Sequence, residues 1–313
     1  MGKIRWLHIS DLHFGYNRYL VQNMREELFS RIKTIEKIDY LFITGDLRYG
    51  KEEPDSYPEE TVEFINGMKD ALGLKKESVF IVPGNHDVTR KDNNLPVIIE
   101  NEKNKYKTSN GKISKDTLDY IQGKRVEFSK LYESICGRKE PSVHYCIETE
   151  MVNIIHLNTA LFSSKDGEDG DLIIGTQLLK EMSDQINPNK PGIVLAHHPI
   201  DSLRLEEQKA LEIFLKKHNA VLYLCGHKHV AFNNNIKTAR QDQDLWEYVC
   251  GTNMDSDPQL EETDMDFFVG EMDCENCSGY VQAYKWSKRS EAWLVDIDFS
   301  FPQDGANDGR HYF

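Results

Sequence analysis

Acidic, imidazole and amide side chains recur in this sequence at the points where short apolar runs end. The run "FIVPGNHDV" at residues 80–88 passes through a proline and a glycine into Asn85, His86 and Asp87. Four other apolar runs end in similar groups: Asp11 with His13 in "SDLH", Asp46 in "GDL", His197 with His198 in "HHP", and His227 with His229 in "GHKH". Such side chains bind metal ions or transfer protons, so the pattern predicts a site for this chemistry.

The types of donor narrow the choice of metal. Carboxylate, imidazole and amide oxygen donors without a thiolate suit manganese, iron or zinc. The set is larger than a single tetrahedral ion requires, so two divalent metal ions that share one bridging carboxylate fit it. We expect manganese first, with iron or zinc as alternatives.

The apolar periodicity indicates how the chain positions these groups. Residues 4–10, 40–45 and 78–84 have the composition of buried strands, and the segments between them repeat apolar residues at helical spacing. The expected helices lie at about 19–37, 58–73, 117–135, 175–186 and 205–218, and the later strands at 143–158 (a pair), 192–199 and 220–229. This alternation favours a parallel sheet, and the ligand crevice of such a sheet forms at the carboxyl ends of its strands. The polar groups follow those ends.

Two regions differ from this pattern. Residues 90–117 are polar without convincing periodicity, which predicts a long loop. After residue 229 the helical signal fades, and the runs at 245–251, 267–272, 279–286 and 292–299 predict strands of a second, mainly antiparallel sheet. We treat 1–313 as a single domain. Its motif-bearing part is 1–230, its β-rich part 231–300, and a possible tail 301–313.

The order of the motifs resembles the calcineurin-like metallophosphoesterase superfamily. Asp-x-His, Gly-Asp, Gly-Asn-His-Asp, His-x-Pro and Gly-His-x-His follow one another between residues 9 and 229. The resemblance implies an α/β fold, a four-layer α-β-β-α sandwich of two mixed sheets flanked by helices. It also implies two ligand sets, Asp11, His13, Asp46 and His229 for one ion and Asp46, Asn85, His197 and His227 for the other. Asp46 would then bridge both ions.

The same resemblance implies roles for the neighbouring residues. His86 would face the substrate, and Asp87 could hold its ring. A hydroxide that bridges the two ions would attack phosphorus in line, while protonated His86 stabilises the developing charge or donates a proton to the leaving oxygen. His198, Arg48 and Arg90 lie near motif positions and are candidates for substrate contacts. The histidines outside the motifs are expected to be structural: His8, His144, His156, His218 and His311.

The motifs and the charge restrict the substrate. Serine/threonine phosphatases of this superfamily carry an Asp-Arg pair soon after Gly-Asp and end the third motif in Glu, and "GDLRYG" and "GNHD" do neither. "GNHD" is instead similar to cyclic-nucleotide phosphodiesterases and to DNA-repair nucleases. A formal net charge of −14 argues against non-specific coating of nucleic acid and favours a nucleotide or another compact phosphodiester.

Two other functions compete with that of a phosphodiesterase acting on a small diester. The lysine-rich segment 101–115 favours a polynucleotide near the site, so a metal-dependent nuclease acting on DNA or RNA is the main alternative. A non-catalytic interaction scaffold is disfavoured because every ligand position is retained.

The remaining features concern the compartment. No apolar run approaches the ~18 residues that a membrane-spanning helix needs, so we expect no membrane segment and a cytoplasmic protein. The six cysteines are scattered and are expected to be reduced thiols. Cys274 and Cys277 form a CxxC pair, but no second pair accompanies it to complete a zinc site.

Overall fold

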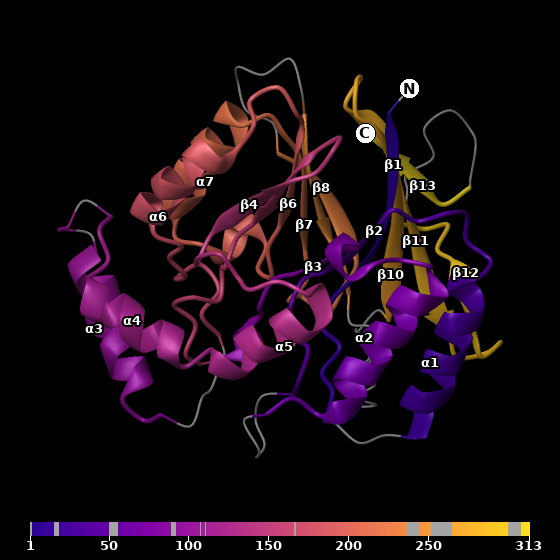
Figure 1. Cartoon of the computed structure of the whole chain (residues 1–313), viewed down its shortest axis with the longest axis horizontal. Helices are drawn as coiled ribbons and strands as arrows, with labels where there is room; N and C mark the ends of the chain where they lie inside the picture. Colours follow the sequence, from indigo (N-terminus) through magenta and orange to yellow (C-terminus); the bar gives the residue numbers. More distant parts are fainter. Residues whose placement is uncertain are drawn as a thin grey trace.

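The structure, a computed structural model, contains two β-sheets packed face to face with helices on both outer faces (Figure 1). It describes residues 2–15, 19–49, 56–88, 92–106, 108–109, 111–165, 167–236, 244–251, 265–299 and 308–313. Both sheets contain parallel and antiparallel pairs. The predicted four-layer α/β sandwich of two mixed sheets is confirmed.

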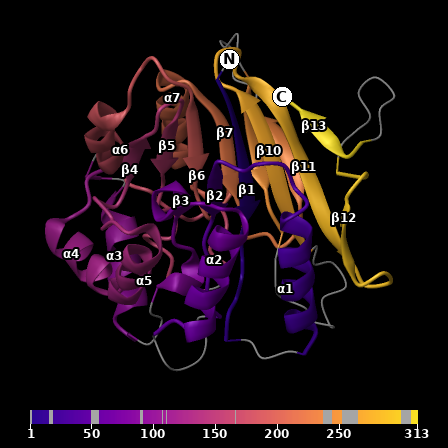
Figure 2. The same cartoon turned by 45° about the vertical axis from the view of Figure 1, so that its right-hand side comes forward.

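The first sheet is built around β1 (Lys3–Ile9). On one side β2 (Tyr40–Ile43) and then β3 (Val79–Ile81) continue it in parallel. On the other side β10 (Asp266–Asp273) pairs antiparallel with β1 and with β11 (Ser278–Ser287). The strands β12 (Ala292–Val295) and β13 (Arg310–Tyr312) both pair with β11, as Figure 2 shows.

The second sheet has the order β4-β5-β6-β7-β9-β8. Its strands are β4 (Tyr145–Glu148), β5 (Asn153–His156), β6 (Gly192–Leu195), β7 (Ala220–Cys225), β8 (Phe232–Ile236) and β9 (Leu245–Val249). The prediction that the C-terminal strands form a sheet of their own is therefore wrong. β9 joins this sheet and β10, β11 and β12 join the first, because periodicity identifies a strand but not its pairing partner.

Helices complete the outer layers. The first sheet carries α1 (Tyr19–Ile32), α2 (Glu59–Ala71) and α5 (Val126–Cys136), and the second carries α6 (Thr176–Met182) and α7 (Leu205–Lys217). The helices α3 (Leu95–Tyr106) and α4 (Lys115–Gly123) contact each other and cover a smaller core of their own. None of these described helices is both long and apolar enough to cross a bilayer.

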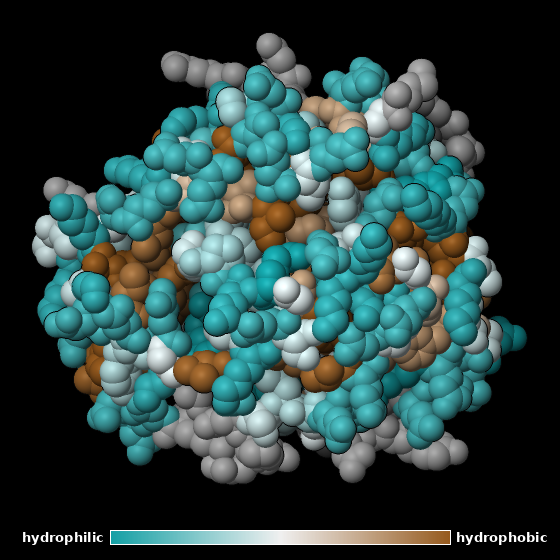
Figure 3. Space-filling model, in the orientation of Figure 1, coloured by the Kyte–Doolittle hydropathy of each residue, from teal (hydrophilic) through white to brown (hydrophobic). Residues whose placement is uncertain are grey.

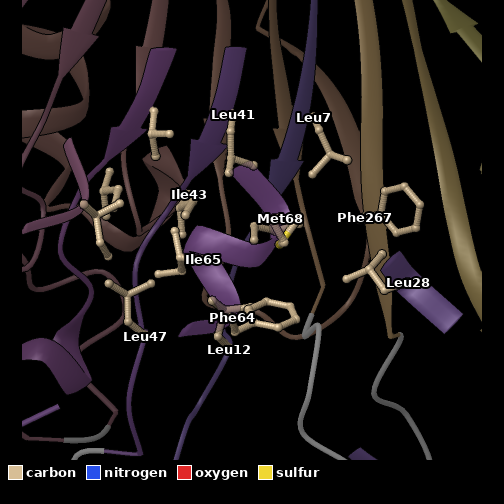
Figure 4. Close-up of a cluster of buried hydrophobic side chains, with 14 of the residues drawn as sticks. Leu7, Leu12, Leu28, Leu41, Ile43, Leu47, Phe64, Ile65, Met68 and Phe267 are labelled. Atoms are coloured by element: carbon tan, nitrogen blue, oxygen red, sulfur yellow. The ribbon is translucent and has the colours of Figure 1, made fainter. Parts of the chain in front are cut away.

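Alternation of side chains along the strands divides the apolar residues between the layers. In β1, Ile4 and Trp6 lie in the core between the two sheets, whereas Leu7 and Ile9 lie in the core beneath the helices. Figure 4 shows the second of these cores, with Leu7 near side chains of α1, α2 and β10. The outer surface in Figure 3 is mainly hydrophilic, with apolar side chains in separate patches.

The segment between β3 and α4 contradicts the sequence prediction. A long loop was expected at 90–117, but residues 95–106 form the helix α3. Its buried face carries Leu95, Ile99 and Tyr106 together with the charged residues Glu102 and Lys103. Two buried positions of the helix are therefore polar, so an apolar period is not visible in the sequence.

The predicted helix at 117–135 is two helices. Ser114 caps the first, α4, because its hydroxyl accepts a hydrogen bond from Thr117 N at 3.3 Å. α4 ends at Gly123, and α5 begins at Val126. Apolar residues continue across the boundary between α4 and α5, so the periodicity of the sequence does not reveal that the helix is interrupted.

The buried lysine of α3 is held by two carboxylates. Lys103 Nζ lies 3.0 Å from Glu168 Oε1 and 3.1 Å from Asp171 Oδ2, and its side chain is 1% exposed. Glu168 also accepts hydrogen bonds from Ser164 N at 2.7 Å and Lys165 N at 3.1 Å. This cluster ties α3 to the segment that follows β5.

We expect Lys103→Ala to destabilise the protein by about 3 kcal/mol, because it leaves buried Glu168 without its cation. Lys105→Ala is the matched control on the same helix, since Lys105 is exposed. It should change the free energy of unfolding by less than about 0.5 kcal/mol. Urea denaturation followed by circular dichroism measures both, and equal effects would show that the buried ion pairs contribute no stability.

Candidate metal and catalytic site

Five strands end at one rim of the two packed sheets and deliver polar residues to it. Asp11 and His13 follow β1, Asp46 follows β2, and the short helix Asn85–Asp87 follows β3. In the second sheet His197 follows β6, and His227 and His229 follow β7. The structure thus brings together, from both sheets, the residues that the motifs singled out.

The first group of donors contains Asp11, His13 and His229. His229 Nε2 lies 3.2 Å from both Asp11 Oδ1 and His13 Nε2. His13 Nε2 lies 3.7 Å from Asp11 Oδ1 and 4.0 Å from Asp46 Oδ2. Donors about 2.1 Å from one ion lie roughly 3.0–3.4 Å apart at cis octahedral or tetrahedral angles and up to about 4.2 Å apart at wider angles, so these separations are compatible with a divalent cation.

The second group contains Asn85, His197 and His227. Asn85 Oδ1 lies 3.0 Å from His197 Nε2 and 3.2 Å from His227 Nδ1. His197 Nε2 is also 3.3 Å from Asp46 Oδ2, the oxygen that faces the first group. One carboxylate oxygen therefore borders both donor groups.

Main-chain contacts orient these ligands. His86 N donates to Asp46 Oδ1 at 2.7 Å, and His227 N donates to Asp11 Oδ2 at 3.0 Å. His197 Nδ1 lies 2.8 Å from the carbonyl oxygen of Thr44, to which it can donate, so that Nε2 is directed at the donor group. In Asp46, Asp11 and His197, one side-chain atom thus contacts the main chain, and the second oxygen or nitrogen remains available to a metal ion.

The backbone at the site adopts an unusual conformation. Asp11, His13, Asp46, His227 and His229 have positive φ angles of 53°, 44°, 51°, 74° and 56°. Non-glycine residues rarely adopt this left-handed region, and clusters of them mark functional sites. Here it turns the chain sharply after each strand, so that neighbouring side chains face one point.

Glycines in the motifs permit the close approach of these turns. A Cβ atom on Gly84 would lie 2.1 Å from Asp46 Oδ1, and one on Gly226 would lie 2.3 Å from Asp11 Oδ2. Gly45, with a φ of 96°, lies against the main chain of Gly84. The glycine that directly precedes Asp46, Asn85 and His227 in "GD", "GNHD" and "GHKH" thus has a steric reason.

Electrostatics keep the carboxylates ionised. Burial opposes ionisation of Asp11, but hydrogen bonds with His13 and His229 hold its pKa well below the usual value. Burial lowers and Asp46 raises the pKa of His197, and Asp46 prevails, with a resulting pKa of about 9. A cation that binds His197 must displace this proton, so cation affinity should fall as the pH falls.

His86 lies beside the donor groups. Its Nε2 atom is 3.9 Å from Asp46 Oδ2, and its ring packs edge-on to that of His13 with centroids 5.0 Å apart. Tyr49, which the sequence analysis did not single out, stacks on His86 at 6.0 Å. Arg48 is buried and donates from Nε to the carbonyl oxygen of His86 at 3.1 Å, which fixes the main chain there.

The carboxylate of Asp87 contacts the main chain around the motif. Among the described residues, its carboxylate is hydrogen-bonded to Gly84 N at 2.8 Å, Leu47 N at 3.1 Å and the Tyr57 hydroxyl at 2.8 Å, rather than to the ring of His86. Burial and the nearby Asp46 raise its pKa to about 6. Asp87 therefore braces the loop that presents His86, and a role in holding the ring of His86 stays a prediction.

The candidate substrate contacts differ from one another. His198 is buried, with Nδ1 3.0 Å from the Thr159 hydroxyl, and burial together with His227 holds its pKa well below the usual value. It is therefore neutral and lines the pocket beside the donor groups. Arg90 lies outside the described residues.

The five histidines expected to be structural are buried. Each has a hydrogen-bond partner: His8 with Thr44, His144 with Ile174, His156 with Ile154, His218 with Ser183 and His311 with Tyr248.

A segment that the sequence analysis missed also lines this pocket. Residues 163–172 contribute Lys165, Glu168, Asp169 and Leu172 to the lining, together with His198 and the donor groups. The Lys165 side chain is exposed and supplies a positive charge there. Apart from its glycines and aspartates, "KDGEDGD" carries no signal that would have connected it to the motifs.

The calcineurin-like phosphoesterase family model matches residues 4–231, a range that includes every motif. The chain belongs to the calcineurin-like phosphoesterase family. Members of this family are metal-dependent phosphoester hydrolases. The two donor groups in this member supply the aspartates and histidines that divalent cations require.

The curated relatives that the chain matches are longer than it is. The uncharacterized metallophosphoesterase-like protein YydB of Bacillus subtilis (strain 168) is 29% identical over 307 residues, which are 93% of this chain and 61% of YydB. The putative metallophosphoesterase At3g03305 of Arabidopsis thaliana is 24% identical over 241 residues, 74% of this chain and 30% of that protein. The chain thus spans less than two thirds of either relative.

Solved structures that are similar to the chain share little sequence with it. A dimetal phosphatase from Danio rerio has a TM-score of 0.48 at 10% identity, covering 93% of this chain and 98% of that chain. A Vps29 single mutant from Entamoeba histolytica has a TM-score of 0.44 at 10% identity, covering 99% of both chains.

Gly226→Ala tests the steric argument for the motif glycines. The added Cβ would lie 1.9 Å from Ser10 Oγ and 2.3 Å from Asp11 Oδ2, so Asp11 must shift away from His229. We expect affinity for Mn²⁺ to fall at least about 10-fold, as for other disturbances of the groups that support metal ligands.

The control is Gly123→Ala at the end of α4, where an added Cβ meets nothing within 4 Å. Isothermal titration with Mn²⁺ measures both variants, and circular dichroism verifies that they fold. Wild-type affinity in a folded Gly226→Ala variant would contradict the steric role of this glycine.

Proposed function

We propose that the chain is a dinuclear metal-dependent phosphoesterase that hydrolyses a phosphodiester of the nucleotide or cyclic-nucleotide type. The observation that carries this proposal is the position of Asp46 Oδ2, 4.0 Å from His13 Nε2 and 3.3 Å from His197 Nε2. A carboxylate between two imidazole-rich donor groups suits a bridge between two cations. Mn²⁺ is the cation we expect, with iron or zinc as alternatives.

The bound cations would supply Lewis acidity, which activates water and neutralises phosphate oxygens. The chain would contribute the geometry. Asp11, His13 and His229 on one side of Asp46, and Asn85, His197 and His227 on the other, would fix the positions of the two cations. Neutral His198 and the exposed amino group of Lys165 lie in the same pocket and would contact the substrate.

His86 is proposed as the residue that acts on the leaving group. It lines the pocket, and its Nε2 is 3.9 Å from Asp46 Oδ2, close enough for His86 to group with His13 and Asp46, although the motifs assign it to neither ligand set. A protonated imidazole there can donate to the departing oxygen, a contribution of roughly 10²–10⁴-fold in rate. The stacked Tyr49 ring and the Arg48 contact to its carbonyl group would hold it in place.

The lysine-rich segment gives less support to a polynucleotide than its composition suggested. Lys103 is buried in ion pairs, and Lys115 is paired with Asp119 at 2.8 Å. Of the lysines between Lys103 and Lys115, the structure describes Lys105 and Lys112, and Lys107 lies outside the described residues. The burial of Lys103 removes one positive charge from the surface of this segment, which favours a compact diester, with a nuclease of DNA or RNA as the second candidate.

Asp46→Ala tests the two-cation proposal. Removal of the shared carboxylate should abolish hydrolysis and reduce the bound Mn²⁺, measured by elemental analysis after gel filtration, while the thermal unfolding transition remains cooperative. Substrates for the assay are a phosphomonoester, a bis-aryl phosphodiester, cyclic nucleotides, and single- and double-stranded DNA and RNA. Full activity in this variant, or in wild type after exhaustive chelation, would exclude the mechanism. Preference for the polynucleotides would select the nuclease.

His86→Ala separates catalysis from metal binding. We expect both cations to remain while kcat falls by roughly 10²–10⁴-fold. The loss should be smaller for a nitrophenolate, which departs without a proton, than for a nucleoside alkoxide, which needs one. His227→Ala is the matched comparison and should lose a cation together with activity. If His86→Ala loses cations to the same extent, His86 is a ligand and its assigned role is wrong.

A further inference from the structure

The ring of His227 is one of the two partly exposed imidazoles of the donor groups, the other being His229, whose side chain is 26% exposed. The side chain of His227 is 24% exposed, whereas those of His13 and His197 are 2% and 0% exposed. Nδ1 is 3.2 Å from Asn85 Oδ1 and so faces the donor group. A partly exposed ring can rotate or change tautomer unless its other nitrogen is held.

Asp169 occupies the position that would hold it. Asp169 Oδ1 lies 3.4 Å from His227 Nε2, on the side of the ring opposite to Nδ1. Asp169 comes from the wall segment 163–172, which no motif includes. An imidazole that donates its Nε2 proton to a carboxylate keeps the lone pair of Nδ1 available for a cation and is a more basic ligand.

The carboxylate of Asp169, whose side chain is 51% exposed, has two further contacts. The Ser202 hydroxyl donates to Asp169 Oδ1 at 2.6 Å, and Lys228 Nζ lies 3.0 Å from Oδ2. The adjacent main chain is also tied to this position, because Gly170 N and Leu172 N donate to the carbonyl oxygen of Ser202 at 2.9 and 3.3 Å. The position of Asp169 thus depends on Ser202, in the segment that follows β6, as well as on the segment that contains Asp169.

The charge of Asp169 is compensated where substrate would bind. Asp169 lines the pocket, and an unpaired carboxylate there would repel a phosphate group. Lys228, the residue between His227 and His229, pairs with Asp169. The carboxylate can therefore accept from the ring without leaving a net negative charge at the pocket wall.

We propose that Asp169 is a positioning residue that holds His227 in the Nε2–H tautomer and directs its Nδ1 toward the second cation. This inference rests on the proposed two-cation function. It assigns a role in that function to the wall segment. Ser202 and Lys228 hold the carboxylate in place.

The test uses Asp169→Asn, which removes the charge with little change in shape. Asp201→Asn is the matched control, because Asp201 Oδ1 lies 3.9 Å from the same Lys228 Nζ on the exposed surface. Isothermal titration with Mn²⁺ should show that Asp169→Asn binds one cation as wild type does and the other roughly 10–100-fold more weakly. Asp201→Asn should bind both as wild type does.

A second measurement does not depend on the metal. Imidazole ¹⁵N spectra of the chelated protein at alkaline pH report the tautomer of each histidine, and His227→Ala assigns the signals. The Nε2–H form of His227 should predominate in wild type and in Asp201→Asn, and the Nδ1–H form should increase in Asp169→Asn. Ser202→Ala should produce a smaller increase of the same kind.

The outcomes distinguish this inference from the proposed function. Wild-type Mn²⁺ affinities and an unchanged tautomer in Asp169→Asn would overturn the role of Asp169 and leave the two-cation proposal intact. A wild-type chain that binds a single cation, but in which the tautomer of His227 responds to Asp169→Asn, would overturn the two-cation proposal and retain the positioning of the ring.

Discussion

Two buried carboxylates, Asp11 and Asp46, set the constraint on which the rest of the structure depends. Removal of an ionised carboxylate from water costs several kcal/mol, which must be offset by nearby donors and cations. In this protein one oxygen of each carboxylate accepts a main-chain hydrogen bond, from His227 N and His86 N respectively. The other oxygen faces imidazole nitrogens. The carboxylates are thus kept ionised in a geometry that a divalent cation completes.

That geometry requires an unfavourable backbone. Five residues of the candidate donor groups have left-handed φ angles, at about 1–2 kcal/mol each, or roughly 5–10 kcal/mol together. This sum is comparable with the net stability of a whole domain. It is sustained because each turn follows a strand that is buried between two apolar layers, and because Gly45, Gly84 and Gly226 remove the Cβ atoms that would separate the turns. Packing of the sheets therefore stabilises a site that local sequence preference opposes.

A polar scaffold links the periphery to the same site. Lys103 of α3 binds Glu168 and Asp171, which flank Asp169 in the wall segment. Glu168 in turn accepts from the main chain of Ser164 and Lys165. A lysine that composition assigned to nucleic-acid contact is thus part of the structure that shapes the pocket. The charge of a segment indicates its partners only when its side chains are free to meet them.

The sequence by itself determined the ligand types, their order along the chain and most of the elements that carry them. The helices α1, α2 and α7 and the strands β1, β2 and β3 were predicted because their periodicity is local. The family membership likewise followed from motifs such as "GNHD" and "GHKH". Only the tertiary structure decided that β10 pairs with β1, that α3 buries Glu102 and Lys103, and that Asp87 faces the main chain rather than His86. It alone brought Asp169 to His227. These contacts join residues far apart in the sequence, and a pattern of neighbouring residues fixes which face of an element is buried but not what that face meets.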